Sequence, residues 1–309
     1  MLFDIQSIQE AKDIVRDVAL ETPLQFNDRL SEQYGAKVYF KREDLQPVRS
    51  FKLRGAYHKI YKLSTEERKR GVVCASAGNH AQGVALACNR LGIKGTIFMP
   101  VPTPKQKLGQ VRMFGGENIE IRLTGDTFDD AYAAAQSYKD ETNSMFVHPF
   151  EDEDVVIGQA TLALELIEQT EEPIDYILVP IGGGGLISGI LHVFKTLSPQ
   201  TKVIGIEPEG APAMQQSLAK GKNTELNDID PFVDGAAVRK VGDDAFRLCT
   251  TYLDKLVLVS EGKICQSILK LYNKEAIVVE PAGAMSTASL KMIAKEIKGK
   301  NVVCLICGG

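Results

Sequence analysis

The sequence lacks the features that mark secreted, membrane-spanning and disulfide-stapled proteins. Its six cysteines are scattered along 309 residues, whereas a small disulfide-rich domain concentrates them in a short chain. No stretch is apolar enough to span a bilayer, and residues 1–10 alternate polar and apolar side chains, unlike the apolar core of a signal peptide. We therefore expect reduced thiols, no membrane partner and a cytoplasmic location.

Nucleic acid and metal are also unexpected partners. The formal net charge is −4, and no run of clustered Lys and Arg could follow a phosphate backbone. Cys304 and Cys307 form a C-x-x-C pair, but residues 301–306 have the pattern of a buried strand, in which positions three apart point to opposite faces. The four histidines are dispersed, at positions 58, 80, 148 and 192. The sequence therefore predicts no nucleic-acid, metal or redox site.

The pattern that is present indicates an α/β protein. Hydrophobic residues make up 44% of the chain, enough for a large core. Short β-rich runs alternate with longer helical patterns, which is typical of a mostly parallel sheet. Within residues 51–147 the predicted strands are 72–73, 96–99, 119–123 and 145–147, and a second series follows at 176–179, 203–206, 256–259 and 302–306. Two α/β domains are therefore predicted.

Two helix starts can be predicted from capping patterns. Ser7 and Glu10 have the spacing of a capping box ahead of an apolar stripe. Pro104 follows Thr103 and stands where the first residue of a helix is expected, a position that tolerates proline. We expect helices to begin at these two points.

A lysine stands where an extended acidic segment gives way to a predicted helix. The acidic segment is Glu43-Asp44-Leu45-Gln46, and the lysine lies in Ser50-Phe51-Lys52-Leu53-Arg54-Gly55. A single lysine is most often a solvated surface charge, and this motif alone does not exclude that interpretation. Its significance depends on the two turns described next.

Four consecutive glycines follow a predicted strand and precede a predicted helix that begins near Ile187. They lie in Pro180-Ile181-Gly182-Gly183-Gly184-Gly185-Leu186. Without side chains, consecutive backbone N–H groups can converge on a phosphate at a helix N-terminus. The spacing is not G-x-G-x-x-G and no Walker lysine follows, so a nucleotide is not specifically indicated. A tight turn beneath a packed helix is the alternative interpretation.

A second strand-to-helix turn has the sequence Ser76-Ala77-Gly78-Asn79-His80-Ala81-Gln82-Gly83. Its small side chains leave several N–H donors available to a carboxylate. Asn79 could equally cap the helix, and His80 could be an ordinary buried imidazole. Taken alone, this turn leaves both interpretations open.

In order and spacing, the motifs SFKLRG, SAGNHAQG, GGGGL and EPAGA resemble those of the threonine and serine dehydratase branch of the fold-type-II pyridoxal-phosphate enzymes. The resemblance covers nearly the whole chain. It implies an α/β protein with two domains built on open twisted sheets, similar to the tryptophan synthase β subunit, and places the early strand 38–41 with the second series. The expected domains are a large cofactor-binding domain of residues 1–50 and 148–309 and a small α/β domain of residues 51–147.

The resemblance also implies how the cofactor, pyridoxal 5'-phosphate, is bound. Lys52 forms the Schiff base, Phe51 packs against the pyridine ring, and Asn79 binds the 3-hydroxyl of the ring. The phosphate is held by the backbone of Gly182, Gly183, Gly184, Gly185 and Leu186. Cys307 stands where the family usually has a serine as partner of the ring nitrogen. A thiol is a weaker donor, but both groups are neutral, so the nitrogen is not held firmly protonated and expulsion of a leaving group is favoured.

The substrate site follows from the same resemblance. The carboxylate of an amino-acid substrate is held by Ser76, Ala77, Gly78, Asn79 and His80. Glu280, in the EPAGA motif, lies in a second active-site segment of the family and is expected among the cofactor-binding residues. The implied reaction converts L-threonine to 2-oxobutanoate and ammonia, with L-serine as a side substrate. Lys52 removes the α-proton, and the cofactor phosphate protonates the departing hydroxyl.

Three departures from the family pattern narrow the expectation. Racemases of this branch carry a second serine where this chain has Ala77, so racemisation is not expected. Their divalent-cation site is incomplete here, because Glu207 is present but Ala213 stands at the downstream acidic position. The sequence ends at Gly309, whereas biosynthetic threonine deaminases continue into a domain that senses isoleucine. The resemblance implies a role in isoleucine and branched-chain amino-acid biosynthesis, and without that domain we expect catalysis to be unaffected by isoleucine.

Alternatives remain open at this point. A serine dehydratase or a β-replacement synthase of the same fold would share these motifs, and a pocket separates substrates that differ by one methyl by only about 1 to 3 kcal/mol. A non-catalytic anion- or nucleotide-binding protein would use the glycine turn alone and would not need Lys52. Enzymes of this kind are commonly homo-oligomers, and we expect a dimer or tetramer.

Overall fold

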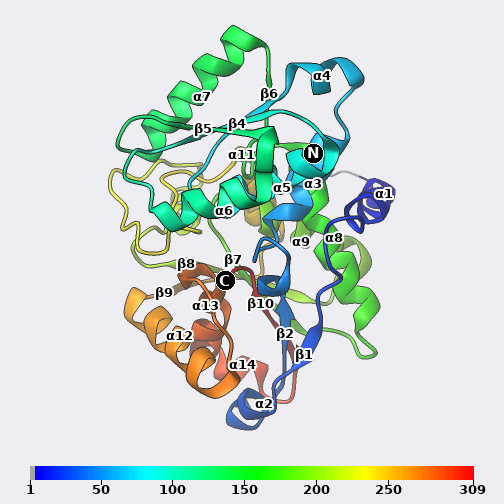
Figure 1. Cartoon of the computed structure of the whole chain (residues 1–309). Helices are drawn as coiled ribbons and strands as arrows, with labels where there is room; N and C mark the ends of the chain where they lie inside the picture. Colours follow the sequence, from blue (N-terminus) through cyan, green and yellow to red (C-terminus); the bar gives the residue numbers. More distant parts are fainter. Residues whose placement is uncertain (1–3) are drawn as a thin grey trace.

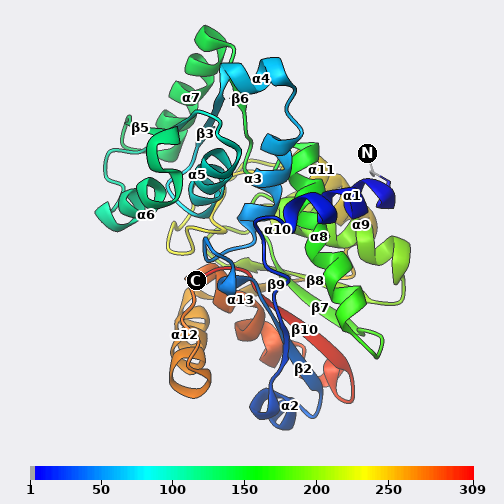
Figure 2. The same ribbon diagram turned by 45° about the vertical axis from the view of Figure 1, so that its right-hand side comes forward.

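The computed structural model describes residues 4–309, so what was expected of residues 1–3 lies outside its described part. The chain forms one sheet of six strands and one of four. Figures 1 and 2 show the two sheets in separate lobes, with the C-terminal end of the chain where the lobes meet. The predicted α/β class is confirmed, because parallel strands alternate with helices in both sheets.

The larger sheet has the strand order β1-β2-β10-β7-β8-β9, and every neighbouring pair is parallel except β1 with β2. The predicted strand 38–41 is β2, and its Val38 pairs with Val302 of β10, so its expected place beside the second series is confirmed. The strands are β1 Leu24–Phe26, β2 Lys37–Arg42, β7 Tyr176–Pro180, β8 Lys202–Pro208, β9 Lys255–Val259 and β10 Asn301–Ile306.

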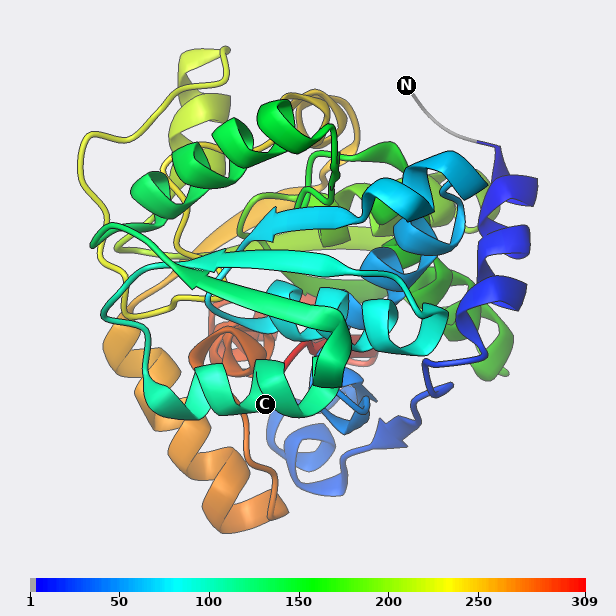
Figure 3. The same cartoon turned by 45° about the horizontal axis from the view of Figure 1, so that its top comes forward.

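The smaller sheet is entirely parallel, in the order β5-β4-β3-β6. Side chains alternate between its two faces: Val73 and Phe98 pack with α7, whereas Cys74 and Ile97 pack with residues of α5. Figure 3 looks onto this lobe and shows helices on both sides of its strands. The strands are β3 Val72–Ala75, β4 Gly95–Met99, β5 Ile119–Leu123 and β6 Met145–Phe146.

The helices fill the space around and between the sheets. In the larger lobe α13 packs on strands β7 to β10, and α8 packs on α9, which lies against β7. No helix among residues 4–309 has both the length and the apolar character needed to cross a membrane. The α-helices are α1 Ile5–Val15, α2 Asp28–Tyr34, α3 Lys52–Tyr61, α4 Thr65–Arg70, α5 Asn79–Leu91, α6 Lys105–Gly115, α7 Phe128–Thr142, α8 Glu153–Gln169, α9 Gly185–Leu197, α10 Ala213–Lys220, α11 Asp243–Tyr252, α12 Glu261–Glu275, α13 Pro281–Ser289 and α14 Ala294–Ile297.

Some local expectations were wrong. Helix α1 does not begin at the Ser7 capping box, because Asp4 caps it three residues earlier and its side chain accepts a hydrogen bond from Gln6 N at 3.2 Å. Helix α6 begins at Lys105, so Pro104 precedes its first residue instead of occupying it. The acidic segment is not extended but forms a 3₁₀ turn at Glu43–Leu45. Strand β1 was not predicted, since three partly exposed residues give no usable alternation.

Candidate active site

The predicted site segments lie at the carboxyl ends of parallel strands. Residues 76–80 follow β3, the glycine turn follows β7, and Cys307 follows β10. Ligands of open parallel sheets bind beyond this edge, where the loops meet. Segments from both lobes meet there, since Asn79 of the smaller lobe contacts Glu280 of the larger one.

Lys52 is the first residue of α3, and its amine is directed at the far side of the site. Lys52 Nζ donates a hydrogen bond to Pro149 O at 2.8 Å. Phe150, which follows Pro149 in the sequence, packs against the glycine turn, since a Cβ added at Gly185 would lie 3.0 Å from Phe150 Cα. Nζ also lies 5.4 Å from the centre of the Phe51 ring. The amine is thus held beside the glycines and not directed into solvent.

The surroundings of Lys52 favour the neutral amine. Burial lowers the pKa of Lys52 to about 8, while the Cys307 thiol and the Glu280 carboxyl act in the opposite direction. Cys307 directly follows β10 and Glu280 is the N-cap residue of α13, so the amine lies within electrostatic reach of both segments. A lysine with a pKa near 8 can act as a nucleophile or base close to neutral pH.

The glycine turn leaves a row of backbone donors open. Gly184 has a φ of +98°, in the left-handed region that strains any other residue. A Cβ at Gly183 would overlap the Phe150 ring, and one at Gly182 would lie 2.9 Å from Ala236 Cα. Within residues 4–309, no hydrogen-bond acceptor is found for the N–H groups of residues 182–187. Helix α9 begins at Gly185, two residues before the predicted start, so these donors lie at a helix N-terminus, where backbone N–H groups are available to an anion.

Asn79 is held by Glu280, a contact that the sequence did not predict. Its Nδ2 lies 2.8 Å from Oε1 and 3.0 Å from Oε2 of that carboxyl. Gly78 occupies the cap position of α5, so Asn79 is not the helix cap. Burial raises the pKa of Glu280 to about 7. The hydrogen bond from Asn79 acts in the opposite direction but is the weaker effect. A side chain at Gly308 would collide with Glu280, so the end of the chain packs against this pair.

The turn at residues 76–80 offers backbone N–H donors more than polar side-chain groups. Ser76 Oγ accepts a hydrogen bond from Gly78 N at 3.2 Å. The buried His80 is directed away from the turn, and its Nε2 lies 2.8 Å from Val147 O. Burial and the charge of Lys52 lower the pKa of His80 to about 3, so its imidazole is neutral at physiological pH. The alternative of a buried imidazole therefore describes the His80 side chain, which leaves its backbone N–H for a carboxylate.

Cys307 connects the end of β10 to the residues before Lys52. Its carbonyl accepts a hydrogen bond from Phe51 N at 3.3 Å, and Ser50 forms a β-bridge with Gly308. Burial raises the pKa of the Cys307 thiol well above its ordinary value, and the Glu280 carboxyl adds to this effect. The thiol is therefore protonated and can act as a neutral hydrogen-bond partner.

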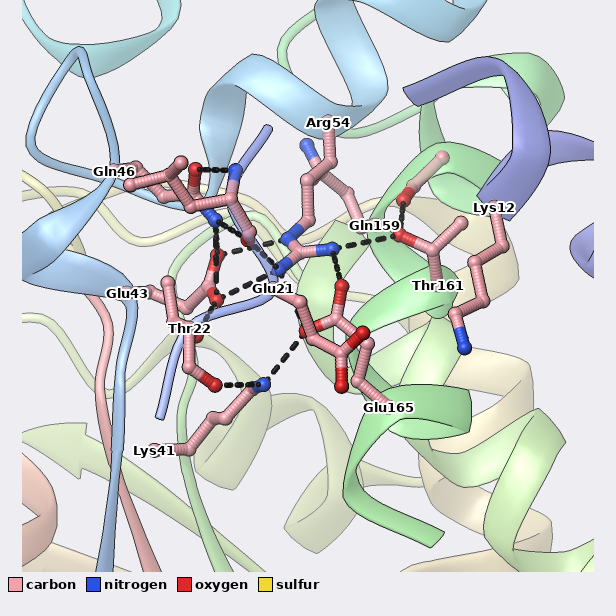
Figure 4. A network of polar contacts seen from close by, with 12 residues as sticks. Lys12, Glu21, Thr22, Lys41, Glu43, Gln46, Arg54, Gln159, Thr161 and Glu165 are labelled. Carbon is pink, nitrogen blue, oxygen red and sulfur yellow. Dashed lines mark hydrogen bonds and ion pairs between the residues drawn. The ribbon is translucent and has the colours of Figure 1, made fainter. Parts of the chain in front are cut away.

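Arg54, two residues after Lys52, belongs to a buried cluster of charges that the sequence motifs did not predict (Figure 4). Arg54 Nε lies 2.8 Å from Glu43 Oε2, and its Nη1 lies 2.5 Å from Glu165 Oε1. Lys41 Nζ lies 2.6 Å from Glu165 Oε2. The side chains of Lys41, Glu43, Arg54 and Glu165 are at most 5% exposed. Two positive and two negative groups balance, and the cluster ties β2, the turn after it and α8 to the helix that begins with Lys52.

Glu207 does not belong to a visible cation site. Its Oε1 and Oε2 accept hydrogen bonds from Met214 N at 2.7 Å and Gln215 N at 2.8 Å, at the start of α10. Burial raises the pKa of Glu207 to about 7. Among residues 4–309, no group of three or more His, Cys, Asp or Glu side chains is placed to hold a metal ion.

The arrangement fits a phosphorylated aldehyde such as pyridoxal phosphate. The open N–H groups of residues 182–187 suit its phosphate, and the glycines leave room that Cβ atoms would fill. The amine of Lys52, with its lowered pKa, is available to an aldehyde beside them. The amide of Asn79 and the thiol of Cys307 supply neutral polar groups for a heteroaromatic ring.

Comparison with known sequences agrees with this geometry. The profile of the family described as "Pyridoxal-phosphate dependent enzyme" matches residues 15–308. The chain is 55% identical over 305 residues to the L-threonine dehydratase biosynthetic IlvA of Halalkalibacterium halodurans, covering 99% of this chain and 74% of that protein. It is 53% identical to the protein of the same name from Bacillus subtilis, covering 100% of this chain and 73% of that protein.

The chain also resembles solved structures over nearly its whole length. The processed form of threonine deaminase isoform 2 from Solanum lycopersicum superposes with a TM-score of 0.93 at 40% identity, covering 98% of this chain and 84% of that chain. Maize serine racemase superposes with a TM-score of 0.94 at 31% identity, covering 100% of this chain and 94% of that chain. Both likenesses extend over both sheets.

Proposed function

Because the chain belongs to the pyridoxal-phosphate dependent enzymes, in the branch of the biosynthetic threonine dehydratases, we propose that it eliminates water from L-threonine and releases its nitrogen as ammonia. Loss of water gives an enamine, which tautomerises to an imine, and hydrolysis of the imine yields 2-oxobutanoate and ammonia. The observation that carries this proposal is the amine of Lys52, held 2.8 Å from Pro149 O beside the open N–H groups of the glycine turn.

Residues from both lobes would hold the cofactor. Lys52 would bind its aldehyde, the N–H groups of residues 182–186 its phosphate, and Phe51 one face of its ring. Asn79 would bind the 3-hydroxyl, and the thiol of Cys307 would face the ring nitrogen. When bound, pyridoxal phosphate withdraws electrons from the α-carbon of the amino acid and so makes its α-proton removable.

Lys52 is also the base in this proposal. Its pKa of about 8, lowered by burial, leaves more neutral amine near neutral pH than an ordinary lysine has. Glu280 stays close enough to influence Lys52, but its hydrogen bonds go to Asn79, so its proposed role is to orient that amide. We therefore assign the proton transfer at the α-carbon to Lys52 alone.

The substrate carboxylate would bind the turn at residues 76–80. Ser76 would contribute its hydroxyl, and the start of α5 its backbone N–H groups. Ala77 has no hydroxyl to protonate the opposite face of the α-carbon, so the proposed reaction is elimination and not racemisation. L-Serine differs from threonine by one methyl and is a proposed side substrate.

The proposed setting is isoleucine biosynthesis in the cytoplasm, by a homodimer or homotetramer. The name shared by the H. halodurans and B. subtilis relatives supports the biosynthetic role. We also propose that residues 51–147 form a small domain and that residues 1–50 and 148–309 form the large one. The pairing of β2 with β10 and the separate four-stranded sheet support this division.

The test combines spectroscopy with product analysis. Purified protein should show a visible absorbance band of bound cofactor and should form 2-oxobutanoate from L-threonine faster than pyruvate from L-serine. Lys52→Ala should lose both the band and turnover, whereas Lys62→Ala, an exposed lysine at the end of the same helix, should keep both. A Lys52→Ala protein with normal turnover would refute the proposal.

A further inference from the structure

Helix α3 is tied to the larger lobe by the ion pairs of Arg54 and Lys59 with residues of α8 and its N-terminal cap. Beyond α3, two polar side-chain pairs join residues 62–146, which carry the smaller sheet, to residues 151–309. One is Asn79 with Glu280. The other is the ion pair of Lys107, on α6, with Asp234, in the stretch 221–242 between α10 and α11. In Figures 1 and 2 this stretch, drawn in yellow, passes beside α6. The charges of Lys107 and Asp234 both affect the pKa of Glu280, so the two pairs lie near each other between the lobes.

On the side of the larger lobe, Asp234 is fixed to the wall of the glycine turn. A Cβ added at Gly182 would lie 2.9 Å from Ala236 Cα, and one added at Gly235 would lie 3.2 Å from Glu280 Oε1. The backbone here is ordered by its own hydrogen bonds, because Ala236 N lies 2.8 Å from Val233 O. Asp234 therefore cannot shift far without disturbing residues that line the candidate cofactor site.

On the side of the smaller lobe, Lys107 is coupled to the turn at residues 76–80. Helix α6 packs along α5, and Gln82 Nε2 donates to Gln110 Oε1 at 3.1 Å between them. Helix α5 begins with Asn79, directly after Ser76 to Gly78. Helix α5 packs on α6 as well as on α3, so a shift of α6 away from Asp234 acts directly on the helix that begins with that turn.

The strength of the Lys107–Asp234 pair suits a contact that breaks and reforms. Its side chains are 34% and 49% exposed. Ion pairs with this much solvent around them shift an equilibrium by no more than about fivefold, and salt weakens them further. The contact can therefore bias the lobes towards a closed arrangement without preventing them from separating.

We propose that Lys107 and Asp234 form a latch that holds the turn at residues 76–80 closed over the glycine turn and so retains the bound amino acid. The identity of that amino acid rests on the proposed function, but the latch itself does not. Lys107 is a positioning residue, because it acts through α6 and α5 and contacts neither the glycine turn nor Lys52. Breaking the pair increases the fraction of open protein and speeds the escape of substrate before it reacts.

The test uses the cofactor-loaded full chain with Lys107→Gln, Asp234→Asn, and the swapped pair Lys107→Glu with Asp234→Lys. The matched control is Lys255→Gln, which removes a long-range pair with Glu296 of similar exposure, 40% and 42%, inside the larger lobe. Hydrogen–deuterium exchange is measured on peptides that cover residues 76–91 and 105–115. KM and kcat for L-threonine are measured in parallel, at low and high salt.

The latch predicts about two- to fivefold faster exchange of both peptides in each single variant, no change in Lys255→Gln, and recovery in the swapped pair. It also predicts a KM raised by a similar factor, a smaller change in kcat, and little further rise with salt. Exchange that is unchanged in Lys107→Gln, or unrestored by the swap, would overturn the proposal, as would faster exchange with an unaltered KM. If the protein does not act on threonine, the proposed function fails while the exchange result still decides whether the latch exists.

Discussion

Lys52 illustrates how far the chemistry of one residue depends on neighbours that are distant in the sequence. The motif around it identified the position, but the acceptor of its amine is Pro149 O, 97 residues later. Burial lowers its pKa, and the two groups that oppose this shift, Cys307 and Glu280, are more than 200 residues away in the sequence. A sequence pattern does not show which distant residues surround a side chain. The motif therefore singled out position 52, but the contact of its amine with Pro149 O and its lowered pKa could not be predicted.

The lowered pKa of Lys52 makes a prediction for cofactor-free protein. The pKa is about 8 in the folded chain and 10.5 in an ordinary lysine, so between these values the unfolded chain binds more protons. Folding stability should therefore rise as pH rises through this window. Lys52→Met should be more stable than wild type at pH 7.5, and the difference should shrink towards pH 10. Urea unfolding of both proteins at several pH values measures this, and a difference independent of pH would contradict the assigned environment.

The same limit applies to Asn79 and His80. The sequence left open whether Asn79 caps a helix, and the structure instead gives its amide to the Glu280 carboxyl. Glu280 was identified by motif, but its pairing with a residue 201 positions earlier had no local signal. The imidazole of His80 is buried against Val147 O, and the contact of its backbone N–H with a substrate carboxylate stays a prediction. The residues could be named in advance, whereas their partners required the fold.

At the scale of elements, short β-rich runs predicted most strands well, including the buried strand β10 and the partly exposed edge strand β5. The predicted strands 119–123 and 302–306 match β5 and β10 to within one residue. The ends of helices were less predictable, since Asp4 and not Ser7 caps α1. The acidic segment was misjudged for a different reason. Glu43 is fully buried, and its carboxylate is compensated there by Arg54 of α3 and by the side chains of Thr22 and Gln46.

The buried charge cluster makes a prediction about stability. Replacing Arg54 with Met would leave Glu43 and Glu165 buried without their main positive partner, and losing one member of such a pair costs about 3–5 kcal/mol. We expect Arg54→Met to lower the free energy of unfolding by that amount. Chemical denaturation measures the change, with Lys255→Gln as a control whose exposed pair should contribute less than about 1 kcal/mol. A loss as small as that of the control would show that the cluster does not stabilise the fold.

At the scale of the whole molecule, the order of strands in the larger sheet was beyond local pattern. Strand β2 comes early in the chain yet lies between β1 and β10, and its place followed only from resemblance to a known family. The sequence pattern likewise did not show how the two lobes are placed relative to each other. The pairing of Lys107 with Asp234 could therefore not be predicted. Only the complete fold shows which distant segments, such as those of Lys107 and Asp234, lie side by side.

The central claim is that the amine of Lys52 binds the cofactor. Reducing the purified protein with borohydride fixes a bound aldehyde to the amine that holds it, and peptide mass spectrometry then identifies that amine. The account predicts the added mass on the peptide that contains Lys52, and on no peptide that contains Lys59 or Lys62. A label on another lysine, or an unlabelled Lys52 peptide from protein that carried the cofactor absorbance, would contradict it.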